Sequence, residues 1–197
     1  MLKHYATLTS SRLLPGTGFA QPAQPTPERV GMEDSALVVM TDFERVSAVL
    51  IRTDDSIDEA NLRMRQRGVR LLLVVDAQRT VAGLITANDI LGEKPLQIIT
   101  ERGGRRQDIV VRDIMTPQDR LEVLELRDVR HARVGQIVAT LKETGRQHAL
   151  IVDTDGDGRQ RVRGMFSLTQ IARQLGVSIQ FSGVARTFSE IEALLTH

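Results

Sequence analysis

The chain has 197 residues, enough for one or two domains with a sizeable hydrophobic core. Only 3% of the residues are aromatic, so this core must consist mainly of aliphatic side chains. The formal net charge of +1 gives no indication of nucleic acid or an anionic membrane as a partner. The absence of Cys excludes disulfides and thiolate chemistry and agrees with a cytoplasmic protein. No apolar run approaches the ~20 residues that span a bilayer.

The N-terminal segment has the composition of a flexible tail. Residues 1–27 contain no Asp or Glu and hold four of the six prolines, so they bury too little apolar surface to become ordered. We therefore predict a flexible tail over residues 1–35. Two alternatives stay open: an acid-poor targeting peptide, or a segment, residues 2–14, that folds onto a partner subunit. Residues 37–40 fit either a strand or a helical turn.

A strand, a turn, a second strand and a helix follow one another in the first half of the chain. Residues 69–75 form an apolar run of strand length, residues 76–79 a polar break, and residues 81–85 a second short strand. Thr86 and Asp89 then have the spacing of a capping box, in which a hydroxyl and a carboxylate satisfy free N–H groups at a helix start.

Another strand and helix precede this group. Residues 49–51 are a short apolar piece, and Ser56 and Glu59 again have capping-box spacing. The helix that they begin carries an apolar stripe on one face, made of Ile57, Ala60 and Met64. The complete order is therefore strand, helix, strand, strand, helix.

The second half of the chain repeats this order, with a turn that is four residues longer. The matching pairs are Asp76 with Asp153, Gly83 with Gly164, Thr86 with Ser167, and Asp89 with Gln170. The upstream strand and helix also recur, with residues 123–126 and an apolar stripe of Val134, Ile137, Val138 and Leu141. We place the first unit at residues 43–100 and the second at residues 109–176.

The chain after the second unit, residues 177–197, reads as an extension that ends in a helix. Thr187 and Glu190 have the spacing of a helix cap. The apolar stripe of this helix, formed by Phe188, Ile191, Leu194 and Leu195, needs a partner surface. That surface belongs either to the chain's own core or to a second chain.

Two motifs mark the boundary between the repeats. Residues 83–90, Gly-Leu-Ile-Thr-Ala-Asn-Asp-Ile, close the first copy, and residues 113–117, Asp-Ile-Met-Thr-Pro, open the second. Two tandem units of this kind resemble a pair of cystathionine-β-synthase (CBS) domains, also called a Bateman module, over roughly residues 43–176. The first copy departs from the pattern, because residues 51–54, Ile-Arg-Thr-Asp, stand where Met-Thr-Pro is expected.

This resemblance implies an α+β fold of tandem CBS domains, each β-α-β-β-α. The two units are related by a pseudo-two-fold axis, with their three-stranded sheets packed together and the helices outside. It also implies that the segment before the first unit packs against the second. Two chains of the family associate through their helices into a flat homodimer, and a helix at the C-terminus fits that association.

The residues that catalysis or metal binding would need are not arranged for either. The four His are scattered, and there is no G-x-S-x-G, G-x-G-x-x-G or P-loop sequence, so we expect no enzyme and no catalytic residue. Residues 153–158 match the first half of a calcium-binding EF-hand loop, but its last ligand position falls on Gly164. A polar hairpin turn explains residues 153–158 better. Residues 102–106 read as a solvated linker, with phosphate contact as the alternative.

Thr86 and Asp89 are the best candidates for a ligand site. A hydroxyl and free N–H groups at a helix start can hold a phosphate, and a carboxylate one turn on can accept hydrogen bonds from ribose hydroxyls. Apolar walls from Ile51, Leu71 and Leu84 could enclose an adenine. In the family the corresponding Thr and Asp bind adenosine compounds in this way. The alternative is that both residues only cap the helix.

The second copy retains the cap but loses the carboxylate. Ser167 and Gln170 stand in place of Thr86 and Asp89. Charge-assisted hydrogen bonds are roughly twice as strong as neutral ones, so a Gln should hold ribose more weakly. We therefore expect unequal sites, with the Thr86/Asp89 pocket used and the Ser167/Gln170 pocket weak or empty.

The function that these features predict is regulatory. A stand-alone CBS pair would bind an adenosine nucleotide such as AMP, ADP or ATP between its units, require no cofactor, and signal to a separate effector protein. The alternative is a constitutive interaction or dimerisation scaffold that binds no nucleotide.

Overall fold

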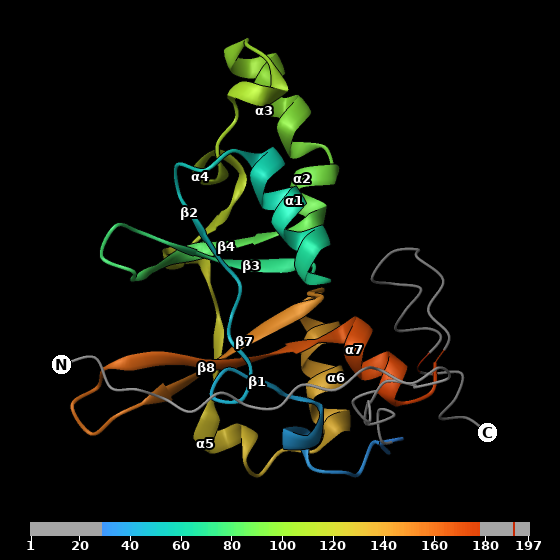
Figure 1. Cartoon of the computed structure of the whole chain (residues 1–197). Coiled ribbons are helices and arrows are strands. Elements are labelled where there is room, and N and C mark those ends of the chain that lie inside the picture. Colours follow the sequence, from blue (N-terminus) through green and yellow to red (C-terminus); the bar gives the residue numbers. More distant parts are fainter. Residues whose placement is uncertain (1–28, 178–190, 192–197) are drawn as a thin grey trace, which may run out of the picture.

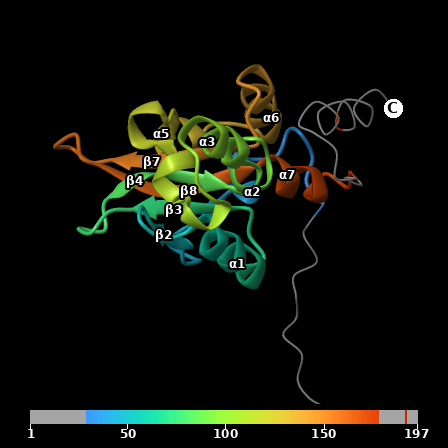
Figure 2. The same cartoon turned by 90° about the horizontal axis from the view of Figure 1, so that it is seen from above.

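Two units, each a four-stranded sheet with helices, make up the computed structural model, which describes residues 29–177 and residue 191. Figure 1 shows the first unit above the second, and Figure 2 shows the helices at the periphery of the two sheets. This arrangement confirms the predicted α+β fold with two tandem units. The predicted C-terminal helix and most of the predicted tail lie outside the described residues. In the described part of the chain, no helix is both long and apolar enough to cross a membrane.

The first unit contains the sheet β2-β3-β4-β5, in that order, in which β2 and β3 are parallel and the other pairs antiparallel. Its strands are β2 (Leu50–Arg52), β3 (Leu71–Val75), β4 (Val81–Thr86) and β5 (Thr116–Pro117), and its helices are α1 (Ile57–Arg67), α2 (Ala87–Leu91), α3 (Lys94–Arg102), η2 (Arg106–Asp108) and α4 (Val111–Ile114). The order β2-α1-β3-β4-α2 is the predicted strand, helix, strand, strand, helix.

The second unit repeats that plan in the sheet β1-β8-β7-β6. Its strands are β1 (Thr41–Asp42), β6 (Val123–Glu125), β7 (His148–Thr154) and β8 (Gln160–Ser167), and its helices are η1 (Ala36–Val39), η3 (Gln118–Arg120), α5 (Leu126–Val129), α6 (Val134–Glu143) and α7 (Leu168–Gln174). The repeated sequence therefore gives a repeated structure.

The two units exchange their edge strands. Strand β1 precedes the first unit in the chain, yet it pairs with β8 of the second unit. Strand β5 precedes the second unit, yet it pairs with β4 of the first. Each sheet therefore has four strands instead of the predicted three, and the fourth strand of each belongs in sequence to the other repeat.

This exchange corrects the prediction that the first copy lacks an opening motif. Met40 and Thr41 hold the place of Met115 and Thr116, because Thr41 pairs with β8 as Thr116 pairs with β4. A simple repeat predicts this segment at residues 51–54, where β2 ends, whereas the exchange puts it farther upstream.

The matching glycines of the repeats allow the exchanged strands to approach. A Cβ atom at Gly83 would lie 2.4 Å from the carbonyl oxygen of Thr116, and one at Gly164 would lie 2.5 Å from that of Thr41. Real Cβ atoms do not come so close to backbone oxygen. Gly at these two positions is therefore a requirement of the strand exchange.

The segment before the first unit packs on the second unit, as expected. Residues 37–40, which the sequence left open, mostly belong to the short helix η1, in which Ala36 and Val39 are buried in the core of the second unit. The backbone N–H of Val30 donates to the carbonyl oxygen of Gln174 at 3.0 Å, so residues 29–35 of the predicted tail also contact this unit.

Three hydrophobic clusters hold the molecule together. One forms the core of each unit, and the third lies between the sheets, where Leu71, Leu73 and Leu150 are buried. Partly buried apolar side chains from both units surround this third cluster, namely Phe43, Ala48, Leu50, Leu84, Leu121, Val123, Val162 and Met165. The units thus bury against one another the sheet faces that their own helices leave uncovered.

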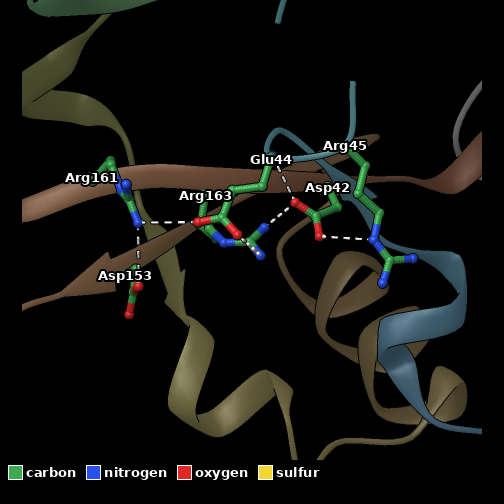
Figure 3. Close-up of polar contacts among 6 residues, drawn as sticks. All are labelled: Asp42, Glu44, Arg45, Asp153, Arg161 and Arg163. Carbon is green, nitrogen blue, oxygen red and sulfur yellow. Dashed lines mark hydrogen bonds and ion pairs between the residues drawn. The ribbon is translucent and has the colours of Figure 1, made fainter. Parts of the chain in front are cut away.

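An ionic network fastens the exchanged strand β1 to β8 (Figure 3). Arg163 on β8 pairs with Asp42 on β1 and, at 2.7 Å, with Glu44. The side chain of Arg163 is 15% exposed and that of Asp42 is 20% exposed, so solvent screens this pair less than a fully exposed one. The hydrogen bond from Arg163 holds the pKa of the Asp42 carboxyl below its ordinary value.

Alanine at either close-contact glycine should destabilise the fold. We expect Gly83→Ala and Gly164→Ala each to cost about 1–3 kcal/mol, because the neighbouring backbone must move to admit a methyl group. The measurement is thermal or urea unfolding. Gly156→Ala is the control, since a Cβ atom there meets no atom within 4 Å and its stability should stay near that of the parent. Equal stability of all three variants would contradict the close contact.

The Asp42–Arg163 pair predicts a pH-dependent contribution to stability. A carboxyl with a lowered pKa stabilises the fold above its unfolded pKa of about 3.9, and this contribution disappears as pH falls through the folded pKa. Arg163→Met should therefore lower the melting temperature at pH 7, and its difference from the parent should shrink below about pH 4. Arg45→Met is the control, because Arg45 is 86% exposed and lies 3.6 Å from Asp42. A difference independent of pH would contradict the assignment.

Candidate functional site

Two cavities lie between the units, one at each of the equivalent helix starts. The larger has a volume of about 660 Å³ and lies beside Ser167 and Gln170. The smaller has a volume of about 350 Å³ and lies beside Thr86 and Asp89. Thr41 of the exchanged strand lines the larger cavity, and Thr116 of the other exchanged strand lines the smaller. The strand exchange therefore completes one wall of each cavity.

In the smaller cavity, the carboxylate of Asp89 is already engaged by its neighbours. One oxygen accepts hydrogen bonds from the backbone N–H of Thr86 at 2.8 Å and from its hydroxyl at 2.7 Å. The other oxygen lies 2.5 Å from the Nζ atom of Lys94, and the side chain is only 12% exposed. The predicted capping box is thus present, and an ion pair occupies the oxygen that would have to face a ribose.

In the larger cavity, the corresponding residues are less engaged. The amide oxygen of Gln170 accepts one hydrogen bond, at 3.1 Å, from the hydroxyl of Thr41. The Ser167 side chain makes no capping hydrogen bond to α7. Thr41 on the exchanged strand and Gln170 on α7 thus meet in this cavity.

The two cavities also differ in charge. Three exposed arginines line the larger one, Arg67, Arg70 and Arg173, and no Asp or Glu is among its described lining residues. In the smaller one, Arg120 and Arg146 are balanced by Asp89 and Glu122, and Arg146 pairs with Glu122 at 3.0 Å. Only the larger cavity presents an excess of positive charge to a ligand.

The wall common to both cavities contains His148, the first residue of β7. Burial, together with the positive charge of Arg70, lowers the pKa of its imidazole to about 4, while the negative charge of Asp89 acts in the opposite direction. His148 is therefore neutral near pH 7. Leu71 holds the equivalent position in the first unit, since it pairs with Thr86 as His148 pairs with Ser167.

The structure brings together only some of the residues that the sequence singled out. Thr86, Asp89 and Leu84 line the smaller cavity, whereas Leu71 lines the larger. Ile51 reaches neither: it is 1% exposed in the core of the first unit. Because side chains alternate along a strand, β2 directs Ile51 toward the helices and its neighbour Leu50 toward the other sheet. The predicted adenine sandwich of Ile51, Leu71 and Leu84 is therefore not formed.

Thr41, His148 and the three arginines of the larger cavity were not among the site residues predicted from the sequence. They come from the exchanged strand and the ends of α1, β3, β7 and α7, and only the fold shows that these segments meet. One available signal was the His at a position where the first repeat has the apolar Leu71. A polar residue in an otherwise apolar strand indicates a candidate functional side chain.

The two other motifs have local explanations. Residues 153–158 belong to the β7–β8 hairpin, where one oxygen of Asp155 accepts from the backbone N–H groups of Asp157 and Arg159. In the connector, Arg102 pairs with Asp113 at 3.1 Å and Arg106 with Asp58 at 3.5 Å. Within the described residues, no group of three or more His, Cys, Asp or Glu side chains is placed to hold a metal ion.

Comparison with known proteins agrees with this architecture. The sequence model of the CBS domain family matches residues 34–95, a range that includes η1 and β1. A search of curated proteins gave no significant match.

Among solved structures, a conserved protein from Pyrococcus horikoshii aligns with a TM-score of 0.54 at 22% identity, covering 78% of this chain and all of that one. A CBS-domain-containing protein from Agrobacterium tumefaciens aligns with a TM-score of 0.50 at 17% identity, covering 69% and 93%. A protein with CBS domains from Burkholderia ambifaria aligns with a TM-score of 0.50 at 24% identity, covering 70% and 88%. At these identities the likeness shows the fold. The family match places a CBS domain at residues 34–95, and the two units together have the fold of these solved structures, two of which are CBS-domain proteins.

Proposed function

We propose that this protein is a regulatory module that binds an adenosine nucleotide in the larger cavity between its two CBS units. The observation that carries the proposal is the excess of positive charge at that cavity, where Arg67, Arg70 and Arg173 meet no carboxylate among the described lining residues. Arginine binds phosphate oxygens with paired, charge-assisted hydrogen bonds. A ligand with phosphate groups suits this site better than a neutral or cationic one.

The size and the remaining walls of the larger cavity suit a nucleotide. Its volume of about 660 Å³ lies within the range of ~300–1,000 Å³ that small-molecule sites occupy. Phe43, Val49 and Leu73 offer apolar surface for a base. The hydroxyls of Thr41 and Ser167 lie in the same cavity and provide donors and acceptors for a sugar or phosphate.

This proposal reverses the assignment expected from the sequence, in which the Thr86/Asp89 pocket is the one used. The sites are still expected to be unequal. Asp89, however, has Thr86 and Lys94 as partners, so a ribose would have to displace an ion pair there. The missing carboxylate of the second copy is offset by its arginines, which act on the phosphate end of the ligand.

Binding at this site would affect the relative arrangement of the two units. The lining residues come from both units, with Arg70 and Leu71 from the first and Ser167 and Gln170 from the second. A ligand that contacts both favours the arrangement in which these contacts are best, and only this difference in affinity shifts the equilibrium. A separate effector protein would respond to the favoured arrangement.

We further propose that the protein acts in the cytoplasm as a homodimer that associates through helices of the first unit. Leu91 is 65% exposed and Leu96 is 66% exposed, and Leu62 on α1 is 40% exposed. These apolar side chains support an interface with a second chain, because burying them would remove apolar area from water.

The alternative function is a constitutive scaffold without nucleotide. It is supported by contacts that join the units in the absence of a ligand. Asn88 of the first unit donates to Gln147 of the second at 3.4 Å, and the buried cluster between the sheets contains Leu71, Leu73 and Leu150. A module held in one arrangement by these contacts would serve as a fixed binding surface.

Nucleotide binding to the larger cavity should depend on its arginines. We expect ATP and ADP to raise the melting temperature, with stabilisation of about 2.7 kcal/mol at a free concentration of 100 times the Kd. Arg70→Gln should weaken ATP binding about tenfold or more, because a charge-assisted hydrogen bond contributes ~1.5–3 kcal/mol. Isothermal titration calorimetry with AMP, ADP and ATP measures the effect.

Two control variants distinguish ATP binding in the larger cavity from ATP binding in the smaller. Arg120→Gln removes an exposed arginine from the smaller cavity and should leave ATP binding unchanged. Asp89→Ala should lower stability by about 1 kcal/mol through loss of the hydrogen bonds that Asp89 accepts from Thr86, with ATP affinity retained. Binding that is lost in Asp89→Ala but kept in Arg70→Gln would return the site to the smaller cavity. A parent protein that no nucleotide stabilises would favour the scaffold.

A further inference from the structure

His148 is the only residue common to the linings given above for the two cavities in the described part of the chain. It begins β7 in the second unit, opposite Ser167 in the ladder. The equivalent residue of the first unit, Leu71, is 6% exposed within the apolar cluster between the sheets. An imidazole thus replaces a buried aliphatic side chain at the centre of the unit interface.

The ring of His148 makes no hydrogen bond to the described part of the chain. In the part of the chain that the structure describes, neither ring nitrogen has a hydrogen-bond partner, although both cavities contain polar side chains. A half-buried imidazole without a partner retains one donor and one acceptor for a ligand. The two cavities are the places from which a ligand could reach it.

Charged groups face His148 from both sides. Arg70, which directly precedes β3, acts on it from the larger cavity, and Asp89 on α2 acts on it from the smaller. The other charged residues that line the two cavities are Arg67 at the end of α1, Arg173 on α7, Arg120 on η3, Arg146 just before β7, and Glu122 just before β6. The larger cavity therefore surrounds the ring with positive charge only.

This surrounding keeps the imidazole neutral, since burial and the charge of Arg70 together lower its pKa to about 4. A phosphate bound at Arg70 would reverse both the sign and the effect of the local charge. A negative charge within ~4–6 Å of a histidine favours the imidazolium form and raises its pKa. The phosphate would then gain a charged donor in place of a neutral one.

We propose that His148 is a direct ligand contact that takes up a proton when an anionic ligand fills the larger cavity, so that binding is linked to pH. The inference rests on the function proposed above. Its sign follows from linkage: a group whose pKa is higher in the complex than in the free protein strengthens binding as pH falls through its pKa in the complex, down to its pKa in the free protein. Affinity for an anionic nucleotide therefore rises on acidification.

The test is calorimetric titration with ATP between pH 8.0 and 5.5, in buffers of different ionisation enthalpy, on the parent and on His148→Leu. Leu is the residue of the equivalent position, so the variant should fold. Protonation of ATP itself is common to both proteins and cancels in their comparison. Below the pKa of His148 in the complex, the Kd of the parent should fall relative to that of the variant by up to about tenfold per pH unit. The parent should take up a proton on binding that the variant does not.

Two further variants test whether the pH dependence comes from the titration of His148. His148→Gln keeps a hydrogen-bonding side chain that does not titrate, so it should bind at pH 8.0 and lack the additional pH dependence. His131→Leu removes an exposed histidine between α5 and α6 that lines neither cavity, and it should retain the pH dependence of the parent. Parallel pH profiles for the parent and both His148 variants would overturn the inference while leaving nucleotide binding intact. Absence of ATP binding at every pH would instead overturn the proposed function, and this inference with it.

Discussion

The exchange of edge strands is the constraint on which the rest of the structure depends. Strand β1 completes the sheet of the second unit and β5 that of the first, and both approach glycines where no side chain would fit. Each unit is thereby unable to form its full sheet without a segment from the other repeat. Thr41 and Thr116 reach their cavities only through this exchange. The cavities between the units are therefore a consequence of the strand exchange.

The fold could be predicted because the residues of the two repeats can be aligned with one another. Matching Gly83 with Gly164 and Thr86 with Ser167 was sufficient to fix the order of strands and helices in both halves. The exchange could not be predicted from the repeat, because pairing between β1 and β8 joins residues more than a hundred positions apart. The repeat alone predicts the opening segment of the first copy next to its helix, whereas Met40 and Thr41 lie upstream of that position.

The site could be predicted only in part, for two physical reasons. Capping residues reveal a helix start, but not whether the side chain is free: nothing in the sequence indicates that Lys94 pairs with Asp89. Apolar residues reveal a strand, but in a short strand they do not reveal which face it presents. Ile51 and Leu50 are equally apolar, and their directions are opposite. Residues that line a cavity from several distant segments, such as Arg67 and Arg173, share no local pattern at all.

Symmetry of the fold and asymmetry of the chemistry together suggest how the module works. Two equivalent cavities are present, but one is neutralised by its own carboxylates and the other is bordered by arginines. His148 separates them, at a position where strict repetition would place a leucine. The most direct test of this account is a crystal structure grown with ATP. We expect a nucleotide in the larger cavity, with its phosphates against Arg70 and near the ring of His148. A nucleotide bound beside Asp89 in the smaller cavity, with none in the larger cavity, would contradict this expectation.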